Sequence, residues 1–346
     1  MANQTGNDFV SSGLSRLTLA PNWNDVRYRR SVIASLVKGV YVLKDDHRRH
    51  RKGSETLAPA WWESFDFKLL KPLMDGGDFS IFGAVYEYKP TFNNSHDLTR
   101  APKFVIAFRG TSKNQDTVLG DMSLNIDIFR NALHRRSRFE KAMQAVENMV
   151  DEKGACNIWL AGHSLGAAIA MLSGKTKAKE GIFLESYLYN PPFIAAPIEL
   201  IPSRKVRFGV QVACTIITVG LNVVLQNNQE RQQSEDLFST LSPWVPNLFL
   251  HPSDPICSGY IGYFEHRETL QSFGVGVIGN LATRYSWQGL VMSAIGSATG
   301  TECWSEEKSH LIPSASVTTS CNPQPHNLSQ WFTDDFVSEP KLYRYT

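Results

Sequence analysis

The chain has 346 residues, of which 42% are hydrophobic and 20% charged, and its formal net charge is +2. This length is sufficient for one large α/β domain with a buried core. The nearly balanced charge gives no indication of a nucleic-acid partner. The five cysteines are scattered and form no Cys-x-x-Cys pair, which argues against a metal site or a disulfide framework.

The N-terminal region is expected to contain an irregular arm and one helix. Residues 1–30 are interpreted as the arm. They lack the basic stretch and long apolar run of a secretory signal, so we expect a cytoplasmic protein. Apolar residues at helical spacing predict a helix over 31–43. The charged run that follows, 44–53, is interpreted as a solvated loop.

Strands and helices alternate through the middle of the chain. Apolar runs rich in β-branched and aromatic residues predict strands at 79–89, 103–111, 156–162 and 181–192. Amphipathic or alanine-rich stretches predict helices at 138–151 and 165–172. This order favours a mostly parallel central sheet that is covered by helices on both faces.

The pattern weakens over 197–245, which is interpreted as a helical cap or insertion within a single domain spanning 1–346. Its apolar stretch 208–225 carries polar residues, so a buried or amphipathic helix is the better interpretation than a membrane span. The basic run Arg48–Lys52 leaves peripheral contact with a membrane open, although solvation is the commoner role of such a run.

The stretch IWLAGHSLGAAIAML places Ser164 between two glycines, where a predicted strand turns directly into a predicted helix. The pattern Gly-x-Ser-x-Gly is weak by itself because it arises often by chance. In this context it predicts a nucleophile elbow, in which Gly162 and Gly166 relieve clashes around a strained serine. An idle serine in a glycine-rich turn is the less favoured interpretation.

A serine nucleophile needs a base, and hydrolases with this elbow follow the chain order Ser, Asp or Glu, His. The neighbouring His163 is expected to point away from Ser164. His326 lies in a proline-containing loop near the end of the chain and is the favoured base. His310 remains its rival, although it precedes an apolar segment that suits a structural role.

The favoured acid is Asp254, in the turn that follows the apolar tetrapeptide NLFL. A strand there would bring its carboxylate to the carboxyl edge of the sheet, where the sites of α/β proteins gather. Its role would be to hold the imidazole tautomer. Asp236, Asp334 and Asp335 fit this position less well.

An oxyanion also needs hydrogen-bond donors. The backbone N–H of Leu165, which follows the serine, is one candidate. The loop after the strand at 103–111 offers a second in Thr111, through its N–H and hydroxyl. No metal or cofactor is implied by these groups.

Four stretches resemble the class 3 (fungal lipase-like) α/β-hydrolases, in particular their lipase-like relatives in plants: VIAFRGTS, IWLAGHSLGAA, HPSDPICSGY and HNLSQWF. The resemblance extends from about residue 79 to the C-terminus and implies an α/β-hydrolase fold. It implies that Ser164 is the nucleophile, Asp254 the acid and His326 the base. Thr111 and Leu165 then form the oxyanion hole.

Two further features concern the oxyanion loop. Asp121 matches a family aspartate near this loop, and the resemblance implies that it supports the oxyanion residue. The secreted lipases carry an apolar lid after this strand, whereas residues 112–120 are mostly polar here. Interfacial activation on bulk triglyceride is therefore not expected.

The leading hypothesis is a serine carboxylester hydrolase of the lipase/esterase type that acts on acyl lipids or small esters. The alternative is a catalytically silent binding or signalling protein on the same fold, since fold alone does not establish function. An acyltransferase with the same three residues is a weaker third hypothesis.

Overall fold

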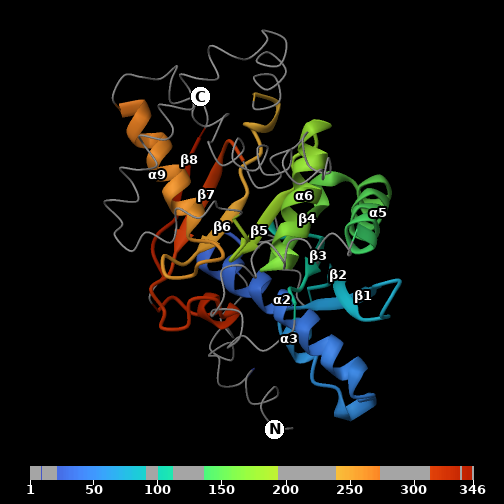
Figure 1. Ribbon diagram of the computed structural model, residues 1–346. Coiled ribbons are helices and arrows are strands. Elements are labelled where there is room, and N and C mark those ends of the chain that lie inside the picture. Colours follow the sequence, from blue (N-terminus) through green and yellow to red (C-terminus); the bar gives the residue numbers. More distant parts are fainter. Residues whose placement is uncertain are drawn as a thin grey trace, which may run out of the picture.

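The computed structural model describes residues 9, 22–90, 100–111, 136–193, 239–272, 312–335 and 337–344. Within these residues, eight strands form one sheet in the order β1 to β8, as Figure 1 shows. The strands are β1 Phe67–Met74, β2 Ile81–Tyr88, β3 Phe104–Phe108, β4 Ile158–His163, β5 Glu185–Tyr189, β6 Asn247–Leu250, β7 Ala315–Thr319 and β8 Lys341–Tyr343.

The centre of the sheet is parallel. Strands β3 to β7 run in one direction, whereas β1, β2 and β8 pair antiparallel at the two edges. The predicted mostly parallel sheet is therefore confirmed. Parallel strands place all their carboxyl ends at one edge, so the loops after β3, β4, β6 and β7 meet there.

Helices cover both faces of the sheet, as predicted. The α-helices of the described chain are α2 Val26–Arg48, α3 Ala60–Glu63, α5 Arg136–Lys153, α6 Leu165–Lys179 and α9 Gly259–Ser272. Helices α5, α6 and α9 pack on one face, and α2 and α3 pack on the other. Short 3₁₀ turns lie at Gly53–Glu55 (η2), Ala155–Asn157 (η5) and Leu328–Trp331 (η7).

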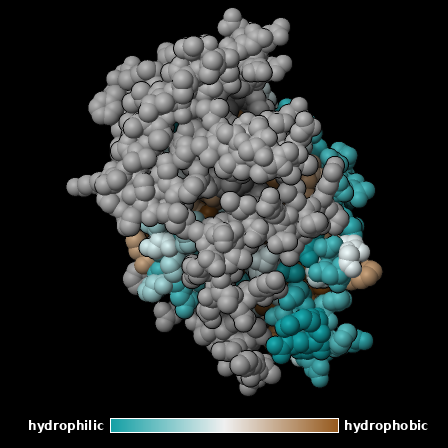
Figure 2. Space-filling model, in the orientation of Figure 1, coloured by the Kyte–Doolittle hydropathy of each residue, from teal (hydrophilic) through white to brown (hydrophobic). Residues whose placement is uncertain are grey.

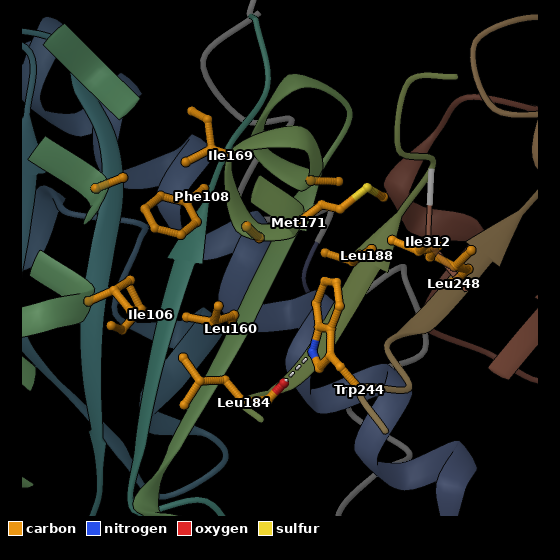
Figure 3. Packing of buried hydrophobic residues seen from close by; sticks show 14 of the residues in the cluster. Ile106, Phe108, Leu160, Ile169, Met171, Leu184, Leu188, Trp244, Leu248 and Ile312 are labelled. Atoms are coloured by element: carbon orange, nitrogen blue, oxygen red, sulfur yellow. Dashed lines mark hydrogen bonds between the residues drawn. The ribbon is translucent and has the colours of Figure 1, made fainter. Parts of the chain in front are cut away.

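Each central strand contributes to two cores because its side chains alternate between the faces. In β3, Ile106 and Phe108 join the core under α5 and α6, while Val105 and Ala107 join the core under α2. Figure 3 shows the first core, where Trp244 also donates its indole N–H to the carbonyl oxygen of Leu184 at 3.0 Å. The two cores hold the sheet rigidly beneath its carboxyl edge.

Helix α2 is longer than predicted at both ends, which corrects the assignments of the arm and of the charged loop. It begins at Val26, because the Asp25 side chain caps it by accepting the N–H of Arg27 at 2.8 Å. It continues to Arg48 and therefore includes the first residues of the charged run. Asp46 explains this extension: it is buried and accepts the N–H groups of the segment at 57–58.

Most predicted strand boundaries are wrong by a few residues. The strand predicted at 79–89 begins only at Ile81, because Phe79 lies in the preceding turn with a positive φ of 52° and is 67% exposed. The prediction at 181–192 shrinks to Glu185–Tyr189. Strand β1 was not predicted, because half of its residues are exposed and a proline such as Pro72 normally argues against a strand.

Several predicted features lie outside the described residues, namely residues 197–238 of the cap, Asp121, Asp236 and His310. None of the described helices is both long enough and apolar enough to cross a membrane. The described surface around the C-terminal end of α2, at the lower right of Figure 2, is mainly hydrophilic.

Candidate active site

Ser164 occupies a strained turn between β4 and α6. Its backbone has φ 54° and ψ −127°, a conformation that a residue with a side chain rarely adopts. A backbone conformation of this kind costs on the order of 1–3 kcal/mol per residue. Such residues are concentrated at functional sites. The N–H of Ser164 is held by the carbonyl oxygen of Tyr189 at 2.9 Å. The side chain is partly exposed at the carboxyl edge of the sheet.

The two flanking glycines are required by close backbone contacts. A Cβ at Gly162 would lie 2.2 Å from the carbonyl oxygen of Gly166. A Cβ at Gly166 would lie 2.3 Å from the carbonyl oxygen of Phe108, on the neighbouring strand. Both distances are far below contact distance, so only glycine allows the helix to start so close to the sheet. This is the local structure of a nucleophile elbow.

The structure brings the predicted acid and base into direct contact. The Nδ1 atom of His326 lies 2.7 Å from Oδ2 of Asp254, although the residues are 72 positions apart. Asp254 follows β6 in a tight turn and is fully buried, whereas the His326 side chain is 15% exposed. A carboxylate acceptor at Nδ1 assigns the ring proton to that nitrogen and leaves Nε2 as the basic atom.

The surroundings of Asp254 keep its carboxylate charged. Burial raises the pKa of Asp254, but hydrogen bonds from His326, the Ile256 N–H and Asn190 outweigh burial and lower it below 3.8. The Ile256 N–H donates to Oδ1 at 3.0 Å, and Asn190 donates to Oδ2 at 2.7 Å. An ionised acid can stabilise a positive charge on His326.

His326 is also tied to the elbow through its backbone. The carbonyl oxygen of His326 accepts a hydrogen bond from Nε2 of His163 at 3.1 Å, and the two rings are 5.1 Å apart. No hydrogen bond joins the Ser164 hydroxyl to His326 within the described residues. Such contacts are often long without substrate and tighten in the Michaelis complex.

The loop after β3 lies directly against Ser164. A Cβ at Gly110 would come within 2.9 Å of Cβ of Ser164, so the Gly110 backbone passes immediately beside the serine. Thr111 follows Gly110 in this loop. Leu165 is the first residue of α6, so its N–H lies next to Ser164. Arg109 fixes the loop because its guanidinium donates to the carbonyl oxygens of Ile81 and Gly110.

A series of hydrogen bonds connects this loop with the backbone of His326. The N–H of Gly110 donates to the Tyr41 hydroxyl at 2.7 Å, and that hydroxyl lies 2.9 Å from Nδ1 of His163. Because a carbonyl oxygen only accepts, Nε2 of His163 carries the proton that reaches His326. Nδ1 of His163 is then unprotonated, and it accepts a hydrogen bond from the Tyr41 hydroxyl. The protonation of His163 therefore determines the donor and the acceptor in each of these three hydrogen bonds.

Burial keeps both side chains of this series neutral. Burial, reinforced by the nearby His326, lowers the pKa of His163 to about 3. Burial also raises the pKa of Tyr41 to about 12, against the opposing effects of the Gly110 N–H and Arg109. A neutral His163 allows His326 to accept a proton. A positive charge on His163 would oppose the protonation of His326, because the two rings are neighbours.

Other predicted candidates fall elsewhere. Asp334 pairs with Arg30 of α2 at 2.6 Å, on the opposite side from the elbow helix, and Asp335 is exposed. A cavity of about 230 Å³ lies between the first turns of α2 and the strands β5 to β7, and Ser164, Asp254 and His326 are absent from its lining. Within the described residues no three His, Cys, Asp or Glu side chains form a group that could hold a metal ion.

Sequence reasoning missed Tyr41 and Asn190. Tyr41 lies in a regular helix, where a tyrosine is normally explained by packing. Asn190 offered one signal, because it stands between an apolar strand and two prolines, a position where asparagine favours a positive φ. The expectation that His163 points away from Ser164 agrees with its contacts to Tyr41 and His326.

Comparison with known proteins places the chain near lipases and esterases. The family model described as Lipase (class 3) matches residues 105–188, which include Ser164 and most of β3 and β5. A protein from Arabidopsis thaliana named GDSL esterase/lipase is 39% identical over 354 residues, covering 98% of this chain and 98% of its own.

Two solved structures were also matched, both of esterases from the archaeon Pyrobaculum calidifontis. The monoclinic form is 11% identical and covers 77% of this chain and 85% of its own, with a TM-score of 0.27. The hyperthermophilic esterase is 14% identical and covers 77% and 83%, with a TM-score of 0.28.

Proposed function

The chain belongs to the class 3 lipase family, with an α/β-hydrolase fold, and from this membership we propose that it is a serine carboxylester hydrolase that forms an acyl-enzyme on Ser164. Family membership supports ester hydrolysis in general. The serine mechanism rests on one observation above all. His326 is bonded to the buried carboxylate of Asp254 through its side chain, and through its backbone to the residue before Ser164.

The proposed reaction begins with proton transfer from Ser164 to Nε2 of His326. As the proton leaves, Oγ attacks the acyl carbon and the carbonyl oxygen becomes an oxyanion. The N–H of Leu165, with the N–H or hydroxyl of Thr111, donates to that oxyanion. These donors are fixed in place before the reaction, so they stabilise charge that exists only in the transition state.

Collapse of this intermediate breaks the ester bond. His326 donates its proton to the departing alkoxide, and the acyl group remains on Ser164. A water molecule then gives a proton to His326 and attacks the acyl carbon, and the second collapse returns the proton to Ser164 and releases the acid. Asp254 stays ionised and stabilises the imidazolium in both halves. We propose acyl lipids or small esters as substrates.

The test compares two serine variants on p-nitrophenyl acetate, butyrate and palmitate. Ser164→Ala removes the nucleophile and is expected to lower kcat by a factor on the order of 10⁴ or more. Ser173→Ala is the matched control, because Ser173 is buried in the same helix and its hydroxyl has no hydrogen-bond partner within the described residues. The control should retain activity.

The chain-length series gives the acyl preference of the same site. If ester turnover by Ser164→Ala equals that of the wild type, the proposed mechanism fails. A wild type that turns over none of the three esters would favour the alternative of a silent binding or signalling protein on this fold.

A further inference from the structure

Asn190 stands at the carboxyl end of β5 in an unusual backbone conformation. Its φ is +46°, in the left-handed region that glycine, asparagine and aspartate tolerate best. The residue is completely buried, and its N–H donates to the carbonyl oxygen of Phe249 at 2.8 Å. Strand β5 ends just before this residue, and Asn190 lies beside Asp254, the proposed acid.

The side chain of Asn190 binds three different segments. Its Nδ2 donates to Oδ2 of Asp254 at 2.7 Å and to the carbonyl oxygen of Pro325 at 3.0 Å. Its Oδ1 accepts the indole N–H of Trp331 at 2.9 Å. The indole only donates and the other two partners, one a carbonyl and the other an ionised carboxylate, only accept, so the orientation of the amide is determined by its neighbours.

From this arrangement we propose that Asn190 is a positioning residue that sets the geometry of the Asp254–His326 pair. The inference rests on the proposed ester hydrolase function. The two N–H bonds of a primary amide diverge at a fixed angle. One holds the acid, and the other holds Pro325, the residue immediately before His326. One rigid group therefore fixes both partners.

The rest of the pocket leaves Asp254 few ways to move. Its Oδ2 also receives the Cys257 thiol at 3.2 Å, and Gln330 donates to the same Pro325 carbonyl at 2.8 Å. Asn190 nevertheless bonds directly both to the acid and to the residue that precedes the base. Misplacement of a catalytic pair by about 1 Å can lower the rate by on the order of 100-fold.

Two substitutions separate positioning from a merely structural role. Asn190→Gly keeps the left-handed backbone and removes the amide. We expect kcat to fall by about 10-fold to 100-fold with KM nearly unchanged, because the acid and base lose their common support while the substrate contacts remain. The readout is kcat and KM on p-nitrophenyl butyrate, with thermal unfolding measured in parallel.

Asn190→Asp keeps the shape and replaces the donor by a second carboxyl group facing Asp254. Two neighbouring carboxylates share one proton, which raises one pKa of the pair. The protonated side chain can donate to Asp254 as the amide does, so activity is retained on the acid side. As pH rises the shared proton is lost, and kcat should decline on an alkaline limb that Asn190→Gly lacks. A structural role alone would not produce this limb.

A readout without turnover keeps this inference distinct from the proposed function. The hydrogen-bonded Nδ1–H of His326 gives a low-field proton NMR signal, which His326→Gln assigns by its disappearance. In Asn190→Gly this signal should weaken or move to higher field, even if the wild type hydrolyses no ester. A folded Asn190→Gly variant with the wild-type signal and wild-type kcat would overturn the proposal. If that variant does not fold, an Asn190→Asp profile without the alkaline limb overturns it.

Discussion

His163 makes the stability of the protein dependent on pH in a direction that the structure determines. Its ring is 2% exposed and its pKa falls to about 3, because burial and the adjacent His326 disfavour the charged form. Farther away, Asp254 favours the charged form and Lys38 opposes it. In the unfolded chain the pKa returns to 6.5. Between these two values the unfolded state binds the extra proton, so folding weakens as pH falls.

The magnitude follows from the two pKa values. Acidification from about pH 7.5 to about pH 5 should remove about 2 kcal/mol of folding free energy through this one residue, since each pH unit below the unfolded pKa counts for about 1.4 kcal/mol. For a chain of 346 residues this corresponds to a decrease of about 3 °C in the unfolding temperature. The contribution of His163 to the folding free energy is fully present above pH 6.5 and is lost progressively toward pH 3.

The assay is urea unfolding of the wild type and of His163→Gln at both pH values. Glutamine retains an N–H donor for the carbonyl oxygen of His326 but does not titrate. The variant should therefore lose about 2 kcal/mol less than the wild type on acidification. Equal losses in both proteins would show that His163 binds its proton normally when folded, and the reasoning about its burial would be refuted.

Three further substitutions test the geometry of the site. Asp254→Asn should lower kcat on the order of 10⁴-fold at neutral pH, because an amide no longer fixes the imidazole tautomer; a kcat within tenfold of the wild type would contradict this. Gly166→Ala should prevent correct folding, as judged by circular dichroism and soluble yield, since its Cβ would lie 2.3 Å from a carbonyl oxygen, while the control Gly77→Ala, with 3.8 Å of space, should fold normally. Tyr41→Phe removes the acceptor of the Gly110 N–H and should reduce kcat about 10-fold to 100-fold and stability by about 1–3 kcal/mol. Tyr28→Phe is the control on the same helix, because the Tyr28 hydroxyl makes no hydrogen bond within the described residues, and it should change kcat little. Equal effects of the two substitutions would argue against a role for the hydrogen bonds of Tyr41.

The parallel half of the sheet could be predicted because its strands are buried on both faces. Such strands carry continuous apolar runs, as in β3 and β4, and the helices between them show helical periodicity. The elbow was predictable for a related reason. Its glycines are dictated by backbone contacts between β4, α6 and β3, so the pattern appears in a short stretch of sequence.

The features that were missed depend on contacts between distant segments. Arg30 seemed to belong to a loose arm, yet it is buried because it binds the carbonyl oxygens of Trp331 and Thr333, some 300 residues away. Tyr41 meets His163 across 122 positions, and Asn190 meets Asp254 across 64. The local pattern around Asn190 suggests a turn but not its partner, and nothing in the short-range sequence distinguishes a packing tyrosine from a hydrogen-bonding one.

Covalent labelling examines the proposed role of Ser164 as a nucleophile that His326 and Asp254 activate. The protein is treated with an aryl fluorophosphonate, and the adduct is located by mass spectrometry of its peptides. We expect one adduct, on Ser164, which forms far more slowly in His326→Ala and requires the folded protein. An unlabelled Ser164 in the folded wild type, or equally fast labelling without His326, would contradict it.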